Sequence, residues 1–146
     1  MPREASATAA TRLPPGVPSL RLLSNDGECV DIESDGDSWL VSLSGPDLSA
    51  SARADYGGYY PAGRVAAFFD DLALNWRGWT DEKTWRSSDD QLRFAASHDG
   101  LGHVTLRATL RDRDWPGEVW TVELLLRVDA GALEAIASDV AAFDQA

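Results

Sequence analysis

The chain has very little cysteine and no long apolar run. Cys29 is the single cysteine among 146 residues, which excludes an internal disulfide framework and fits a reducing compartment. No apolar stretch approaches the roughly 20 residues that a membrane-spanning helix needs. The first residues also lack the apolar core of a signal peptide. The sequence therefore predicts a cytoplasmic protein that does not enter the membrane.

Recognisable catalytic and cofactor motifs are missing as well. The sequence contains no Gly-x-Ser-x-Gly elbow, no phosphate-cradling loop, no zinc-ligand spacing and no dinucleotide fingerprint. Cys29 lies among acidic residues, which raise the pKa of a thiol and weaken it as a nucleophile. We therefore predict no catalytic residue, no cofactor and no metal site, and a function other than catalysis.

Basic side chains are scarce. The chain carries 13 lysine and arginine residues against 24 acidic residues, which gives a formal net charge of −11. Such a surface repels nucleic-acid backbones and anionic lipid, and it suits a basic protein partner. The same charge can also serve solubility alone. The composition thus predicts no nucleic acid and no membrane as partners, favours a basic protein, and does not specify an oligomeric state.

Hydrophobic periodicity divides the chain into a tail and one domain. Residues 1–19 are small, polar and proline-bearing, so we predict a disordered tail followed by a single domain at 20–146. Short alternating strands precede a helical apolar stripe that runs from Val65 to Trp76, and further strands precede a closing helix. This order predicts an α+β fold, with an antiparallel sheet of about seven strands, one central helix and one C-terminal helix.

The stretch 91–111 predicts a β-hairpin down to its register. Even-numbered residues are apolar in both halves, and opposed residues of an antiparallel pair share a face. A three-residue loop at 100–102 sets Phe94 against Ala108 and keeps the core face apolar, whereas a two-residue turn would set Phe94 against an arginine. Gly102 supplies the left-handed conformation that the third loop position needs.

The turn of this hairpin contains two histidines and an aspartate, in the motif His98-Asp99-Gly100-Leu101-Gly102-His103. These residue types bind metals and act as acids and bases. In the predicted register, however, His98 points to the core side and His103 to the opposite side, so the two rings do not converge. We therefore interpret Asp99, Gly102 and His103 as turn-forming residues, with Asp99 and His103 paired across the strands.

Two charged surface features are candidates for partner binding. Six acids and no base fall between Asp26 and Asp37, and the outer face of the hairpin carries arginines. The candidate residues are Asp26, Glu28, Asp31, Glu33, Asp35, Asp37, Arg93, Arg107 and Arg111. A positive stripe on an acidic chain could hold an anionic ligand or partner. The alternative is a solvated sheet face with cross-strand ion pairs.

The six tryptophans can either pack in the core or form a platform for a ligand. Trp39, Trp76 and Trp120 are predicted on core stripes by their periodicity, whereas Trp79, Trp85 and Trp115 lie near predicted loops. The alternative to protein binding is a small-molecule-binding or enzymatic domain with a pocket near Tyr59, Tyr60, Trp79 and His98.

The Trp-Arg-Gly-Trp motif at 76–79 and the His-Asp-Gly-Leu-Gly-His motif at 98–103 resemble those of an uncharacterised family of small actinobacterial proteins. The likeness covers about 20–143 and also includes the closing segment AGALEAIASDVAAF. This resemblance implies no activity, cofactor or catalytic residue. In general appearance, acidic with a closing helix, the chain is similar to some bacterial toxin-immunity proteins.

Three functions remain open on the sequence alone. The leading hypothesis is a non-enzymatic, acidic protein-binding domain of an immunity-type or regulatory kind. The second is the small-molecule-binding or enzymatic domain with its pocket near Tyr59 and Tyr60. The third is a purely structural domain, for which Arg107→Ala and Asp31→Asn should change neither stability nor phenotype much.

Overall fold

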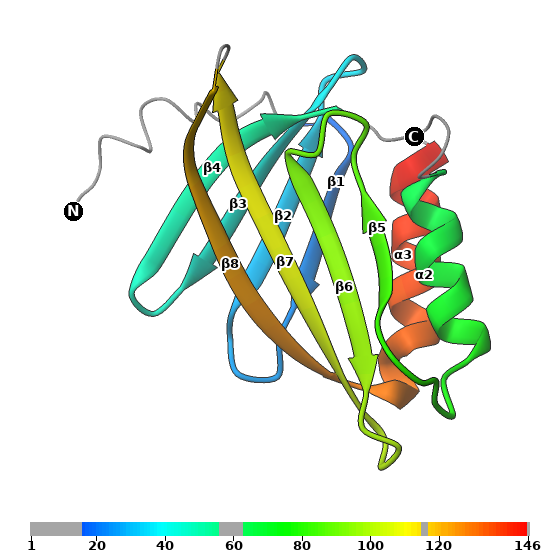
Figure 1. Ribbon diagram of the computed structural model, residues 1–146. Helices are drawn as coiled ribbons and strands as arrows, with labels where there is room; N and C mark the ends of the chain where they lie inside the picture. The colour runs from blue at the N-terminus through cyan, green and yellow to red at the C-terminus, as the bar shows by residue number, and fades with distance from the viewer. Residues whose placement is uncertain (1–15, 56–62, 115–116, 146) are drawn as a thin grey trace.

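The computed structural model describes residues 16–55, 63–114 and 117–145, and within these ranges the chain forms eight strands and two α-helices (Figure 1). In chain order these elements are β1 (Ser19–Leu23), β2 (Cys29–Ser34), β3 (Trp39–Gly45), β4 (Leu48–Ala54), α2 (Val65–Leu74), β5 (Lys83–Arg86), β6 (Leu92–His98), β7 (His103–Asp114), β8 (Gly117–Asp129) and α3 (Leu133–Gln145). A short 3₁₀ turn, Ala130–Ala132, connects β8 to α3.

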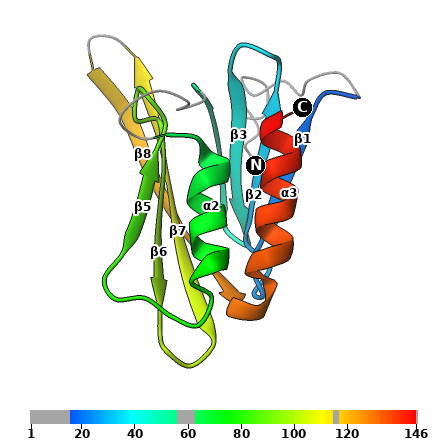
Figure 2. The ribbon, with the colours of Figure 1, turned by 90° about the vertical axis from the view of Figure 1, so that its right-hand side faces the viewer.

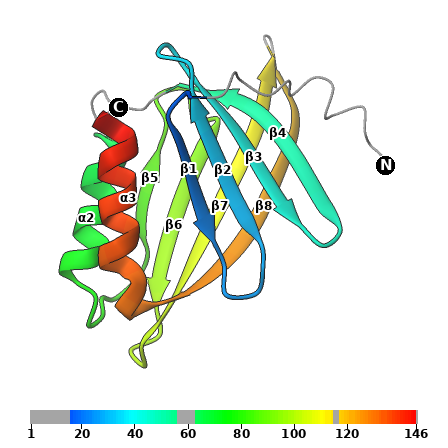
Figure 3. The ribbon, with the colours of Figure 1, turned by 180° about the vertical axis from the view of Figure 1, so that it is seen from behind.

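The strands form two antiparallel sheets of four, ordered β1-β2-β3-β4 and β5-β6-β7-β8. The α+β class with a central and a C-terminal helix is confirmed, but the prediction of one sheet of about seven strands is wrong. Figures 1 and 3 show the two sheets facing each other, one in front of the other. β4 ends the first sheet and β5 begins the second, and α2 lies between these two strands in the chain, so the strands divide into two groups of four.

Both helices lie between the two sheets on the side of β1 and β5, as Figure 2 shows. They pack against each other. The buried residues of α2 are Val65, Phe68, Phe69 and Leu72, which follow the spacing of an amphipathic helix. The order of four strands and a helix therefore occurs twice, and each helix fills the space between sheets that are apolar on their inner faces.

An aromatic cluster joins the two sheets to the two helices. Trp39 of β3 lies 6.1 Å from Trp85 of β5 and 5.6 Å from Phe143 of α3, measured between ring centroids. Phe94 of β6 lies 5.9 Å from Trp85 and 5.5 Å from Phe69 of α2. Large buried aromatic rings dominate the energetics of a core, so this cluster fixes the two sheets relative to the helix pair.

The predicted hairpin register is confirmed. Phe94 pairs with Ala108, and Ala96 with Leu106, across β6 and β7. Gly102 has φ +95°, the left-handed conformation that the turn requires. After β8, the main-chain N–H of Ala130 donates to the Gly102 carbonyl across 2.8 Å. The turn is therefore attached to the chain that enters α3.

The two sheets are also hydrogen-bonded to each other near the end of β8. The main-chain N–H of Asn25, in the β1–β2 turn, donates to the Arg127 carbonyl across 2.8 Å. The Arg127 N–H donates to the Ser24 hydroxyl across 3.0 Å, and Ser24 is buried. These bonds place the β1–β2 turn at the same end of the molecule as the start of β7, because His103 pairs with Asp129.

The predicted tail falls almost wholly on residues 1–15, which lie outside the described residues, and the first strand begins at Ser19. Tyr59, Tyr60 and Trp115 also lie outside them. In the parts of the chain that the structure describes, neither helix combines the length and the apolar character that crossing a bilayer requires.

Candidate functional site

The Asp99 carboxylate holds the β6–β7 turn in one conformation. Its Oδ1 accepts the main-chain N–H groups of Leu101 at 2.6 Å and His103 at 3.1 Å, and its Oδ2 lies 2.7 Å from His103 Nδ1. The N–H of Leu101 is the largest cause that holds the pKa of Asp99 at about 2, below its ordinary value. The predicted pairing of Asp99 with His103 is therefore confirmed.

The imidazole of His98 connects this turn to the loop that follows α2. Its Nδ1 accepts the N–H of Gly100 across 2.8 Å, so that nitrogen carries no proton. Its Nε2 lies 2.8 Å from the main-chain oxygen of Trp76 and must be the donor. Trp79 packs edge-on against the same ring, with centroids 5.1 Å apart. We call residues 74–79 and 99–102 the bridged loops.

The two imidazoles do not form a joint site. His98 faces the α2 side, where both of its ring nitrogens are hydrogen-bonded, whereas His103 pairs with Asp99. A metal ion held by both rings would require these hydrogen bonds to be lost. The geometry therefore agrees with the interpretation of the turn as a structural device, in which His98 acts as a strut between two loops.

The bridged loops present large apolar side chains to solvent. Leu74, at the end of α2, is 82% exposed, Trp76 is 49% exposed, and Leu101, at the tip of the hairpin, is 81% exposed. The prediction that Trp76 packs in the core is wrong, because α2 ends at Leu74. The Asn75 side chain donates to the Asp71 carbonyl at 2.8 Å and ends the helix before Trp76.

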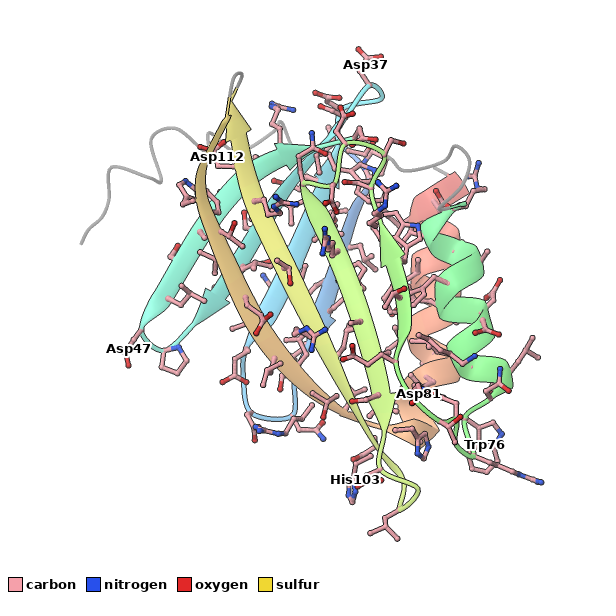
Figure 4. All side chains as sticks on the ribbon, in the orientation of Figure 1. Asp37, Asp47, Trp76, Asp81, His103 and Asp112 are labelled. Atoms are coloured by element: carbon pink, nitrogen blue, oxygen red, sulfur yellow. The ribbon has the colours of Figure 1, made fainter. Side chains whose placement is uncertain are left out.

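Acidic residues outnumber basic residues in the segments that carry these apolar side chains. Residues 70–83 and 99–103 contain five acids against Arg77 and Lys83, a net charge of −3. Lys83 pairs with Asp71 at 2.9 Å, and Arg77 lies over the Trp76 ring, 5.2 Å from its centroid. Figure 4 places Trp76, Asp81 and His103 at one end of the molecule. This end therefore combines exposed apolar surface with negative charge.

The acidic segment 26–37 does not gather into one patch. Asp26 lies near the end that carries His103 and pairs with Arg127 at 3.1 Å, whereas Figure 4 places Asp37 at the opposite end. Asp31 and Asp35 pair with arginines of the same sheet, at 2.8 and 2.9 Å. Glu28 and Glu33 lie between these positions along β2 and the turn before it. The six acids are therefore spread from one end of the first sheet to the other.

The three predicted arginines lie on the outer face of the second sheet. Arg93 and Arg111 both bond Asp90, at 2.5 and 2.6 Å. Arg107 lies 3.0 Å from Glu82 and 3.5 Å from Glu123. The arrangement has features of both alternatives. The arginines share one face, as a positive stripe requires, and they are also paired with carboxylates, as on a solvated sheet face.

The surroundings of Cys29 are those of a structural thiol. It is buried, and its Sγ donates to Asp31 Oδ2 across 3.3 Å. Burial is the largest cause that raises the pKa of Cys29, and the Asp31 carboxylate raises it further. The predicted direction of this pKa shift is confirmed, and a protonated, covered thiol is a poor nucleophile.

Two members of the alternative pocket, Tyr59 and Tyr60, lie outside the described residues. The other two members, Trp79 and His98, are in contact with each other, and both are hydrogen-bonded to main-chain atoms. Trp79 Nε1 donates to the Ala96 carbonyl across 3.0 Å, and both ring nitrogens of His98 are hydrogen-bonded. These groups therefore stabilise the bridged loops.

Leu74, Leu101 and Arg86 were not among the sequence candidates. A leucine between two glycines at a hairpin tip is a usable signal for an exposed apolar anchor. Leu74 falls off the apolar stripe of its helix. Arg86 alternates with Trp85 in β5, and it therefore reaches the outer face of the sheet.

The comparisons with known proteins concern almost the whole chain. Residues 16–146 match the family described as a family of unknown function (DUF6228). No curated protein and no solved structure matches the chain significantly. The match includes both bridged loops and every element of the two sheets. The chain therefore belongs to the family of unknown function DUF6228.

Proposed function

We propose that this protein is a non-enzymatic protein-binding domain that engages a basic partner through the bridged loops. The observation that carries the proposal is Leu101, a leucine 81% exposed at the tip of a turn that Asp99 and His98 hold through four hydrogen bonds to its main chain and to Trp76. Isolated exposed leucines are ordinary, but an exposed leucine on a fixed turn is a preorganised contact.

The neighbouring side chains fit the same role. Leu74, at the end of α2, and Trp76, on the loop that follows, are further exposed apolar side chains. Interfaces typically concentrate binding energy in a few aromatic and apolar anchors, enclosed by a polar rim. The acids of residues 70–83 and Asp99 would form such a rim.

The charge supports a basic partner. The local net charge of −3 belongs to a chain of −11, so a basic surface would be attracted over a long range and an acidic one repelled. Binding of this kind serves immunity-type and regulatory proteins alike. The chemistry of the site supports both equally.

Affinity capture with variant baits tests the proposal. The wild-type chain, Leu101→Ser and the control Leu125→Ser would be used as baits in an extract of the cell that produces the protein. Leu125 is exposed on the outer face of β8, away from the bridged loops. We expect one basic protein to bind the wild type and the control, to be lost with Leu101→Ser, and to bind more weakly as salt rises from about 0.1 M to about 0.5 M.

Two outcomes would count against the proposal. One is that the wild-type bait retains no basic protein. The other is that Leu101→Ser and Leu125→Ser retain the same protein equally well, which would place any binding surface elsewhere.

A further inference from the structure

The last strand of the first sheet, β4, has an uncovered edge. The other three edge strands are covered at least in part, because β1 lies next to α3, β5 lies next to α2, and the Arg127 main chain of β8 bonds the β1–β2 turn. Figure 3 shows β4 at the margin of its sheet, on the side away from both helices. We call its unpaired side the β4 edge. An uncovered edge strand is a template on which another strand can pair.

The register shows which main-chain groups face the β4 edge. The Asp35 N–H donates to the Ser38 carbonyl across 3.1 Å, so the main chain of Ser38 faces β2. This direction alternates along a strand, so the odd-numbered residues of β3 face β4 and bond its even-numbered residues. The N–H and C=O groups of Ser49, Ser51 and Arg53 therefore point outward. In the described part of the chain, none of these groups has a hydrogen-bond partner.

The β4 edge lacks the features that usually protect an edge strand from pairing. Natural edges carry proline, lysine or a bulge. β4 contains neither proline nor lysine, and its register with β3 continues without a shift over the whole strand. Its one charged residue, Arg53, bonds Asp35 at 2.9 Å and the Ser38 hydroxyl at 3.2 Å. Because both lie on the β3 side of β4, the guanidinium is directed away from the β4 edge.

We propose that the β4 edge pairs with the β4 edge of a second copy of this chain, antiparallel and centred on Ser51. Ser51 then exchanges two main-chain hydrogen bonds with Ser51 of the second copy, and Ser49 exchanges two with Arg53 in each direction. The same register sets Ala50 against Ala52 on the inner face. No like charges are opposed within the strand, so the pairing is self-complementary, as a two-fold interface requires.

The residues of the β3–β4 hairpin favour a second copy as the partner. Residues 39–54 contain one acid, Asp47, and one base, Arg53, so this stretch is neutral in a chain of −11. Two acidic molecules repel each other least at a neutral surface. Between Leu48 and Arg53 the strand contains only serine and alanine, so two main chains can approach without a clash. One strand is a smaller contact than the roughly 800 Å² per partner of a stable interface, which predicts a reversible dimer.

The β4 edge is separate from the bridged loops. Figure 4 places Asp47, in the β3–β4 turn, on a different side of the molecule from Trp76. This inference therefore does not rest on the proposed function, and loss of the dimer would leave that proposal standing.

Sedimentation equilibrium of the full chain, with charged variants, tests the pairing. From about 10 µM to about 1 mM, we expect the wild type to shift from the 15.8 kDa of one chain toward twice that mass. Ser51→Lys opposes two like charges and should weaken dimerisation about fivefold or more, and Ser51→Glu should do the same. An equimolar mixture of the two variants should regain the dimer, which would also show that both fold. The matched control, Ser19→Lys on the other edge strand of the sheet, should dimerise like the wild type.

Main-chain amide exchange locates the contact. The amides of Ser49, Ser51 and Arg53 should exchange more slowly as the protein concentration rises, whereas the amide of Arg21 in β1 should not change. A chain that stays monomeric at about 1 mM, or equal dimerisation of Ser51→Lys and Ser19→Lys, would overturn the proposal. Slower exchange of the same amides in a monomer, seen only after cell extract is added, would assign the β4 edge to another protein and overturn the second copy.

Discussion

His98 and Trp76 are joined across two loops by a 2.8 Å hydrogen bond from the imidazole to the main-chain oxygen. The other ring nitrogen accepts the Gly100 N–H. A single side chain therefore fixes the hairpin turn and the end of α2 relative to each other. The main chains next to the two exposed apolar side chains, Leu101 and Trp76, are therefore linked through one imidazole.

Replacing His98 with phenylalanine should loosen both loops. The aromatic ring can still pack against Trp79, but the hydrogen bonds to Trp76 and Gly100 are lost. Two hydrogen bonds predict a loss of about 1–3 kcal/mol in the free energy of unfolding, measured by denaturant titration. His103→Phe is the comparison, since it removes an imidazole that does not contact the Trp76 loop. Equal losses in the two variants would contradict the role of His98 as a strut.

Gly102 should tolerate a side chain poorly for conformational reasons. Its φ is +95°, and no atom lies within 4 Å of the position that a Cβ would take. Gly102→Val should therefore cost about 1–3 kcal/mol of stability from backbone strain alone. Gly131 has equally open surroundings and no positive φ, so Gly131→Val should cost clearly less. Equal melting temperatures for wild type and Gly102→Val would refute the turn assignment.

The turn should resist acid until low pH. The pKa of Asp99 is about 2 in the folded protein, against an ordinary value of 3.8, mainly because its carboxylate accepts the Leu101 N–H. A depressed pKa means that the contribution of Asp99 to stability is present above about pH 4 and is lost as pH falls toward about 2. Carboxyl NMR titration should give a midpoint near 2 for Asp99. A midpoint at the ordinary value would contradict the hydrogen-bonded turn.

Cys29 should react slowly with alkylating reagents. Burial and the Asp31 carboxylate raise the pKa of its thiol, so less thiolate is present at pH 8 than in the unfolded chain. We expect the native protein to react with iodoacetamide at least about tenfold more slowly than the protein in denaturant. Asp31→Asn should lower the thiol pKa and speed the native reaction. Equal rates in native and unfolded protein would show that the thiol is accessible.

The hairpin could be predicted from the sequence because the alternation of apolar and polar residues in its two strands specifies one register. A shift by one residue would turn Phe94 and its neighbours toward solvent. The separation into two sheets could not be predicted in the same way. Alternation shows which face of a strand is buried, but not which strand lies beside it, and β4 and β5 each end a sheet.

The candidate sites depended on contacts that local patterns do not contain. Trp76 continues the helical stripe of Phe69 and Leu72, yet Asn75 ends the helix before it. The hydrogen bond between His98 and Trp76 joins residues that are 22 positions apart in the sequence, so no local pattern reveals it. The pairing of β5 with β6 could not be predicted either, because the residues of so short a strand do not determine which strand lies beside it.

The order parameter of the Leu101 amide, from ¹⁵N relaxation, tests the central claim most directly. If Asp99 and His98 hold this leucine ready for a partner, its value should be about 0.8 or more, similar to the strands on either side, and it should fall in His98→Phe. A value below about 0.6 in the wild type would describe a flexible loop tip and would contradict a preformed docking surface.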